Sequence, residues 1–244
     1  MHHPYRLICP LVVLSLLGCV NAPDDSGGGK GSGNGSFFGN GNVTADSRGG
    51  HTVNGSVQVP DGEKSGDLGT VNGPIHVGDK ATVDSAQTVN GSIDIGSHAT
   101  AESLKTVNGS ISLDDGARVA HSVTAVNGSL TLHSGAEVDG GITNVNGTIR
   151  LNGAHVAGGI RTTGGDIYIE GGSRVEGGIL VQRPPSENWF TSTRVPRIII
   201  GPGSVVQGEL RFERKVELYV SDKATIGPVV GATPVRYAGE GPVS

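Results

Sequence analysis

One short phrase recurs at a nearly constant interval along most of this chain. Its first copy begins at Thr52 and the last of its seven copies begins at Thr162. The copies read TVNGSV, TVNGPI, TVNGSI, TVNGSI, AVNGSL, NVNGTI and TTGGDI, and successive copies start 18 or 19 residues apart. A period this short and regular indicates stacked structural units, and it argues against a compact core enclosed by varied elements.

The pattern within each repeat predicts short β-strands. The segments IDI at 93–95 and ISL at 111–113 alternate apolar and polar residues, whereas no stretch has the spacing of an amphipathic helix. We expect the valines of the repeated phrase, such as Val89 and Val107, to lie in the apolar interior with the other aliphatic residues. Asn-Gly or Gly-Gly marks a bend in each repeat, since both pairs tolerate positive φ. We therefore expect two or three short strands per repeat.

One apolar column can be followed from repeat to repeat at the same position. It reads Val59, Val77, Ile95, Leu113, Leu132, Leu151 and Ile169. The pattern resumes at 198–200 after a longer interval, which predicts a loop, residues 182–197, inserted into a continuous stack. The fold class expected is all-β: a single-stranded, right-handed parallel β-helix over residues 37–230, with about nine coils of about 4.8 Å rise each.

The two ends of such a stack are exposed strand edges that need covering. Phe37 and Phe38 are the expected cap at one end. The proline-containing tail from Pro228 is the expected cap at the other, with residues 231–244 as a C-terminal tail.

The N-terminal residues predict an export signal. Residues 7–17 are an apolar run too short to span a bilayer but of the length of a signal-peptide core. The run ends in LLGC, which resembles a bacterial lipobox. The resemblance implies that residues 1–18 are a lipoprotein signal peptide and that Cys19 is lipidated and anchors the protein to a membrane. The alternative is an ordinary secretory signal in which the cysteine is accidental.

The residues after Cys19 refine this location. Val20 replaces the aspartate that usually retains lipoproteins in the inner membrane, so the resemblance favours the outer membrane of the bacterial cell envelope. Residues 19–36 are rich in Gly and Ser, which predicts a flexible tether. The two cysteines lie at positions 9 and 19, so no disulfide framework or thiolate metal site is expected in the folded part.

The composition fits a thin solenoid with many turns. The chain has 42 glycines among 244 residues and only 4% aromatic residues. Its net charge of −5 gives no indication of a nucleic-acid partner. Over about residues 50–230, the spaced VNG(S/T)(I/L) and GA-x-V-x-x-x-(I/V) phrases resemble those of polymer-forming, bactofilin-like β-helix proteins and of adhesin-like β-strand-repeat lipoproteins of bacteria. The resemblance implies a β-helix and raises self-association as an expectation.

The asparagines of the repeated phrase form a column. Stacked amides can donate hydrogen bonds from coil to coil, which predicts a structural ladder; the alternative is an exposed ladder that binds a ligand. Its members are Asn54, Asn72, Asn90, Asn108, Asn127 and Asn146.

Threonines form a second column two residues ahead of the asparagines, at Thr52, Thr70, Thr88 and Thr106. Flat threonine rows on β-solenoids can order water, so an ice-binding face is an alternative to weigh. The interruption of the column at Ala125 and Asn144 argues against it.

An enzyme is the main alternative class, because many parallel β-helices cleave polysaccharides. Such sites need clustered carboxylates on one exposed face, and the position just before the apolar column carries no recurring acidic pair. The histidines share no register, as His76, His98 and His133 show, so they do not predict a metal site. We expect no catalytic residue, metal or cofactor.

The inserted loop is the one segment that departs from the repeat. It contains Trp189 beside Phe190, with Arg183, Arg194 and Arg197 near its ends. Aromatic and arginine side chains on an exposed loop are typical of binding sites for glycans or protein surfaces. The alternative is a loop that folds back over the side of the stack.

The sequence thus predicts a non-enzymatic, lipid-anchored β-helical scaffold or adhesion-like protein of the cell envelope. Its expected partners are the membrane, an envelope polysaccharide or protein, and other copies of itself. The alternative function is a β-helix that binds or cleaves polysaccharide through the Trp189 loop.

Overall fold

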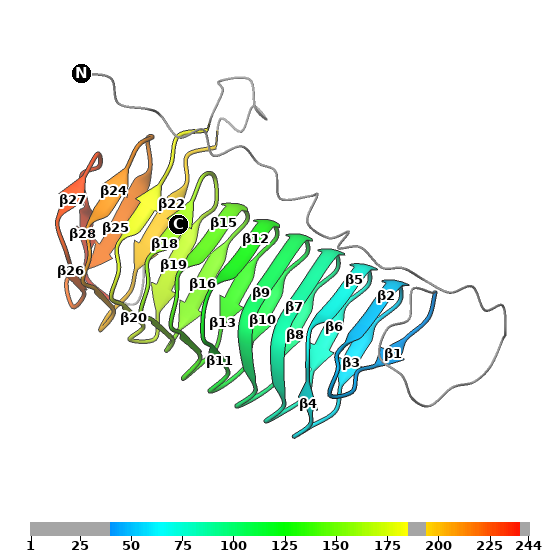
Figure 1. Cartoon of the computed structure of the whole chain (residues 1–244). Helices are drawn as coiled ribbons and strands as arrows, with labels where there is room; N and C mark the ends of the chain where they lie inside the picture. Colours follow the sequence, from blue (N-terminus) through cyan, green and yellow to red (C-terminus); the bar gives the residue numbers. More distant parts are fainter. Residues whose placement is uncertain (1–39, 185–193, 240–244) are drawn as a thin grey trace, which may run out of the picture. The chain divides into compact units, whose positions relative to one another are not determined.

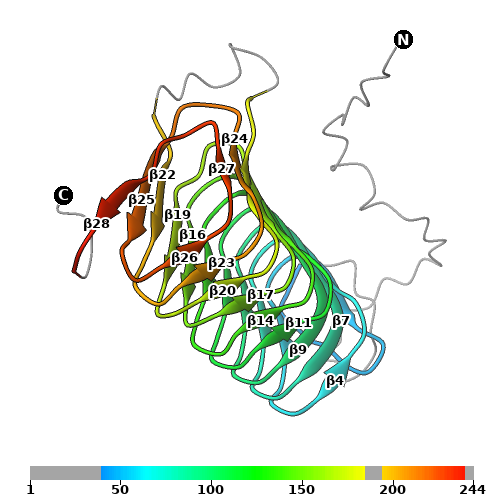
Figure 2. The ribbon, with the colours of Figure 1, turned by 90° about the vertical axis from the view of Figure 1, so that its left-hand side faces the viewer.

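The computed structural model describes residues 40–184 and 194–239, and these residues form an all-β parallel solenoid (Figure 1). The solenoid has about ten turns, close to the nine expected, and strands of successive turns pair in parallel. Each complete turn contributes strands to three faces, which are called here the first, second and third face. In Figure 2 the turns lie one behind another, in sequence order from blue to red.

The first face is an eleven-stranded parallel sheet. Its strands, in order along the stack, are β1 (Val43–Thr44), β3 (Val57–Val59), β6 (Ile75–Val77), β8 (Ile93–Ile95), β10 (Ile111–Leu113), β13 (Leu130–Leu132), β16 (Ile149–Asn152), β19 (Ile167–Glu170), β22 (Arg197–Ile200), β25 (Glu217–Ser221) and β28 (Val235–Tyr237).

The second face contains the repeated phrase. Its strands are β2 (Gly50–Asn54), β5 (Leu68–Asn72), the second half of β7 (Thr82–Asn90), the second half of β9 (Thr100–Asn108), β12 (Val123–Asn127), β15 (Ile142–Asn146), β18 (Ile160–Thr162), β21 (Ile179–Val181), β24 (Leu210–Phe212) and β27 (Val229–Val230).

The third face is built from shorter strands. They are β4 (Lys64–Ser65), the first halves of β7 and β9, β11 (Arg118–Val119), β14 (Glu137–Val138), β17 (His155–Val156), β20 (Arg174–Val175), β23 (Val205–Val206) and β26 (Thr225–Ile226). β7 and β9 each run without a break from the third face to the second. The later turns bend between these two faces instead.

The apolar column predicted from the sequence is confirmed, and it forms one side of the core. Val59 pairs with Val77, and the register continues without slippage to Ile169. Ile200 and then Val220 extend it beyond the inserted loop. All of these side chains are buried. Because every coil covers the apolar layer of its neighbour, the core is one continuous row of aliphatic residues.

The structure corrects the assignment of the valines in the repeated phrase. These valines point outward, and Val53 and Val71 are each 37% exposed. The residue before each valine, a threonine in the first four copies, is buried instead. The reason is the period of two along a strand: Leu104 faces the core, so Thr106 must also face it, and Val107 must face away.

The glycine of the Asn-Gly corner is required by the stacking of the coils. A Cβ on Gly109 would overlap the carbonyl oxygen of Gly91 in the preceding turn, and the same overlap recurs along the column. The glycine therefore serves close packing of backbone against backbone, more than the turn conformation for which the sequence suggested it.

The structure describes one of the two ends for which caps were expected. Phe37 and Phe38 lie outside the described residues. At the other end β27 and β28 pair with the turn before them, so the stack continues past residue 230 into the segment expected to be a tail.

Candidate functional site

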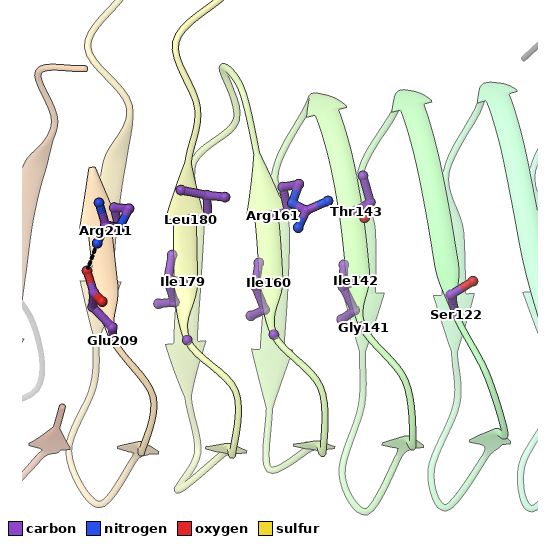
Figure 3. Close-up of a pocket in the computed structure, with 12 residues that line it drawn as sticks. Ser122, Gly141, Ile142, Thr143, Ile160, Arg161, Ile179, Leu180, Glu209 and Arg211 are labelled. Carbon is purple, nitrogen blue, oxygen red and sulfur yellow. Dashed lines mark ion pairs between the residues drawn. The ribbon is translucent and has the colours of Figure 1, made fainter. Parts of the chain in front are cut away.

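A shallow groove of about 530 Å³ crosses the second face over β15, β18, β21 and β24 (Figure 3). Its base is at the bend between the third and second faces, where the glycines Gly141, Gly159 and Gly178 follow one another from turn to turn. The groove is therefore lined by successive coils, so its long direction follows the axis of the stack.

Close backbone packing accounts for the glycine at this bend in three successive turns, between Ser122 and Glu209. A Cβ on Gly159 would lie 2.9 Å from the carbonyl oxygen of Gly178, and a Cβ on Gly141 would lie 3.0 Å from that of Gly159. These positions tolerate little beyond glycine. A row of glycines on the outside of the stack leaves a strip without side chains, which is the hollow of the groove.

Side chains of the second face form the wall of the groove. The strand register places Thr143, Arg161, Leu180 and Arg211 in one outward row on four successive turns. Arg211 forms an ion pair with Glu209 at 2.9 Å, and both side chains are about half exposed. Figure 3 shows the Arg161 side chain on the Thr143 side of its strand, away from that pair.

The groove lies in the basic half of a solenoid whose charge is unevenly distributed. Residues 40–139 contain 5 Lys and Arg against 12 Asp and Glu, whereas residues 140–239 contain 11 against 8. The net charge therefore changes from −7 to +3 between the two halves. The net charge of −5 for the whole chain conceals this difference between the halves.

The predicted binding loop leaves the stack at the corner between the second and first faces, after β21. Trp189 and Phe190 lie outside the described residues. Of the arginines near its ends, Arg197 is the first residue of β22 and Arg194 lies three residues before it. The structure thus places two of the three predicted arginines where the inserted segment rejoins the stack.

Asp166 anchors this end of the insertion. Its side chain is only 5% exposed, accepts a hydrogen bond from the Arg197 backbone N–H at 2.9 Å, and forms an ion pair with Arg194. Arg214 donates to the backbone oxygens of Thr163 at 3.0 Å and Arg194 at 3.2 Å. Arg194 and Arg214 thus hold this end of the insertion to the stack through their side chains, and Arg197 does so through its backbone N–H.

At the other end of the insertion the contact is through the backbone. The N–H of Arg183 donates to the Glu213 carboxylate at 3.3 Å. The Arg183 side chain has no ion pair among the described residues. Of the three predicted arginines, Arg183 is thus the one whose guanidinium could still form an ion pair with a ligand.

On the first face, tyrosine and arginine side chains stack next to the same corner. The guanidinium of Arg150 lies 4.6 Å from the ring centre of Tyr168, and that of Arg197 lies 5.9 Å from the ring centre of Tyr219. Ile199 lies between the two tyrosines in the register and is only 7% exposed. The side chains cover one another, so this row consolidates the sheet.

The asparagine column forms a hydrogen-bonded ladder at the exposed corner after the second face. Each Nδ2 donates to the Oδ1 of the asparagine one turn earlier, over 2.8 Å at Asn72 and 3.1 Å at Asn146. Asn40 extends the ladder by accepting from Asn54. The intervening steps at Asn90, Asn108 and Asn127 measure 2.8 to 3.0 Å.

The threonine column faces the interior, which overturns the ice-binding alternative. The hydroxyls of Thr70, Thr88 and Thr106 each donate to a glycine carbonyl oxygen of the preceding turn over 3.1–3.2 Å. Thr52 makes the same bond at 3.0 Å. A buried row of hydroxyls that are already hydrogen-bonded cannot order water at the surface.

Asn144 occupies the threonine position two strands after Thr106 along the second face. Its Nδ2 donates to the Gly128 carbonyl oxygen at 2.9 Å, but among the described residues its buried Oδ1 has no hydrogen-bond partner. Only 1% of this residue is exposed. An unpaired buried acceptor is costly, so Asn144 is a weak point of the interior.

A network of ion pairs on the third face was not predicted from the sequence. Arg118 pairs with Glu137 and, at 2.7 Å, with Asp139. His155 lies 3.3 Å from both Glu137 and Glu176, which belong to the turns on either side of it. The network links four successive turns on the outside of the stack.

The network affects the titration of one carboxylate. Hydrogen bonds from Arg174 and then from His155 lower the pKa of Glu176 below its ordinary value.

Among the described residues, no group of three or more histidine, cysteine or acidic side chains is arranged to hold a metal ion.

Comparison with known proteins adds no relative: no protein-family model, curated protein or solved structure matches this chain. In the part of the chain that the structure describes, no helix has the length and apolar character needed to cross a membrane.

The groove had a signal in the sequence that was not used. Gly-Gly pairs recur at 140–141, 158–159 and 177–178, and arginines recur at 161 and 211 in equivalent strands. The recurring Gly-Gly pairs indicate the strip without side chains, whereas two arginines in equivalent strands are not a periodic signal.

Proposed function

We propose that this protein is a lipid-anchored, non-enzymatic scaffold or adhesion-like protein of the bacterial cell envelope, held in the outer membrane through Cys19. The observation that carries the proposal is the unbroken register of about ten turns, which gives the solenoid three long faces. Such surfaces suit contact with extended partners. The export signal and the lipobox-like LLGC sequence support the location. The likeness to bactofilin-like and adhesin-like repeat proteins belongs to this proposal.

Lipidation can be tested by incorporation of radiolabelled palmitate, followed by density-gradient separation of the two membranes. The wild-type chain is expected to carry label and to sediment with the outer membrane. Cys19→Ser should lose the label, whereas Cys9→Ser is a matched control that should retain it. Absence of label from the wild-type chain, or its retention in Cys19→Ser, would contradict the proposed anchor.

The scaffold or adhesion role can be tested in cells that express equal amounts of the wild type and of Cys19→Ser. The anchored form is expected to increase attachment of cells to surfaces or to one another. Equal attachment in both strains would contradict a role that depends on display from the membrane.

A second candidate function is binding of an envelope polysaccharide. The groove on the second face favours it, because arginine side chains and a side-chain-free strip are aligned along several turns. Of the carboxylates in the described part of the chain, Glu209 alone lines the groove, and it is paired with Arg211. A site with one paired carboxylate supports binding better than glycoside hydrolysis, which uses two carboxyl groups.

A further inference from the structure

We infer that the groove binds a linear polysaccharide carrying a carboxylate on alternate sugars, with the glycan chain lying along the axis of the solenoid. The inference deepens the proposed function and rests on it, since it names the chemistry of the polymer that the scaffold would hold. The site consists of Arg161, Arg211, Leu180 and the glycine strip, and it differs from the Trp189 loop that the sequence singled out.

The spacing of the two arginines is the first step. Arg161 pairs in register with Leu180, which pairs with Arg211, so the arginines are two strands apart on the same outward row. Neighbouring strands are about 4.8 Å apart, which places the two Cα atoms about 10 Å apart along the axis. In an extended β-linked glycan with alternating sugars, the carboxylates recur once per disaccharide, a repeat of the same order.

The chemistry of the lining is the second step. Guanidinium groups bind carboxylates through paired, charge-assisted hydrogen bonds. The Arg161 side chain is exposed and has no ion pair among the residues that the structure describes. Arg211 is held by Glu209, but an ion pair between half-exposed groups is weak, so a ligand carboxylate can compete for the arginine.

The shape of the groove is the third step. The glycine strip lets a bulky, rigid chain approach the backbone of the stack. Leu180 between the two arginines offers an apolar surface to the C–H groups of a sugar ring, and Thr143 offers a hydroxyl for hydrogen bonding. The site therefore provides charge, apolar contact and polar contact at successive turns.

These features favour a glycan over an acidic peptide. Side chains on one side of an extended peptide recur every two residues, or about 6.6 Å, which is less than the separation of about 10 Å between the two Cα atoms, and the Arg161 side chain turns away from Arg211 (Figure 3). The charge distribution along the stack agrees with an anionic ligand at this location. The acidic half, residues 40–139, would repel such a polymer, and the basic half would attract it.

The test uses the purified full-length chain in detergent and a fluorescently labelled hyaluronan decasaccharide, which carries a carboxylate on every second sugar. Binding is measured by fluorescence polarisation at low ionic strength, where charge contacts are strongest. The same decasaccharide with its carboxyl groups chemically reduced is the neutral control, and poly-glutamate of similar charge is the peptide control. We expect hyaluronan to bind at least about fivefold more tightly than either control, the effect of about 1 kcal/mol.

Three variants locate the site. Arg161→Gln should weaken hyaluronan binding by about fivefold. Lys105→Gln removes the same charge from the same outward row of the second face, but outside the groove, and should leave the affinity unchanged. Glu209→Gln should strengthen binding by about two- to fivefold, because it frees Arg211 and removes a repelling charge; a folding defect would not produce this gain.

Equal binding of the neutral glycan, or binding of poly-glutamate as tight as that of hyaluronan, would overturn the inference. So would an unchanged affinity in Arg161→Gln or an equal loss in Lys105→Gln. The binding assay does not depend on the lipid. A failed palmitate test with intact glycan binding would therefore contradict only lipidation at Cys19, and intact lipidation without glycan binding would contradict only the proposed groove site.

Discussion

Replacing Asn144 with threonine should stabilise the protein. The change tests directly how buried polar groups in the stack are hydrogen-bonded. In four other turns the equivalent residue is a threonine whose hydroxyl donates to a glycine carbonyl oxygen. Asn144 makes the corresponding bond to Gly128 but buries an Oδ1 that has no partner. Asn144→Thr would keep the bond and remove the unpaired acceptor.

The magnitude follows from the cost of that acceptor. An unsatisfied buried polar group costs about 1–3 kcal/mol, and threonine is also the better strand former. Some of the gain is offset where the smaller side chain fills the site less completely. We therefore expect Asn144→Thr to raise the free energy of unfolding by about 1–2 kcal/mol, which corresponds to a rise in Tm of about 2–8 °C for a domain of this size.

Urea denaturation followed by circular dichroism, together with calorimetry, would measure the effect. The matched control is Thr106→Asn, which introduces the same buried amide in a turn that now has a bonded hydroxyl and should destabilise by a similar amount. A neutral or destabilising Asn144→Thr together with a harmless Thr106→Asn would show that the buried Oδ1 without a hydrogen bond does not lower the free energy of unfolding.

Three further predictions concern the stack. Gly109→Ala should destabilise by several kcal/mol, about 3 or more, because the new Cβ would overlap the Gly91 carbonyl oxygen; loss of folded protein in a thermal melt would show it, and an unchanged melt would contradict it. Leu113→Ala should cost about 2–5 kcal/mol in urea denaturation, whereas the outward Val107→Ala should cost less than about 1; equal losses would contradict the alternation. Because the pKa of Glu176 is lowered, its ion pairs stabilise the fold fully above the ordinary pKa of 4.5 and are lost as the pH falls through the lowered pKa. Glu176→Gln should therefore make the free energy of unfolding fall less steeply with decreasing pH in the acid range. An unaltered pH dependence would contradict the role of the network.

The fold could be predicted because the repeat encodes it several times over. The apolar column from Val59 to Ile169 specifies which residues must coincide in successive coils, and the structure confirms that register. The Asn-Gly corner marked one bend of each coil. These signals are strong because burial and close backbone packing restrict the residues at each position.

The valines show where sequence reasoning failed. Hydrophobicity alone placed Val89 and Val107 inside, but the alternation set by Leu104 places Thr106 inside and leaves Val107 outside. Buried threonine is acceptable here because its hydroxyl has a backbone acceptor in the neighbouring coil, and that acceptor is visible only in three dimensions.

The groove and the ion-pair network could not be predicted in the same way. Both depend on which outward side chains meet across turns, and those meetings are set by the strand register in three dimensions. Exposed positions are weakly restricted by folding, so Arg161 or His155 gives no periodic signal of its own. The predicted loop, by contrast, was located by its length, and the described arginines at its second end hold it to the stack.

The corner glycines also govern how a gene for such a protein can change. Each corner glycine contacts the turns directly before and after it, so a cassette of one whole period could be duplicated or excised and the remaining turns would still fit. Removal of 88–105, for example, would bring Asn72 against Asn108 with the same amide bond. A partial period would instead set backbone against side chain, which confines viable length changes to complete turns or to bulges at the corners.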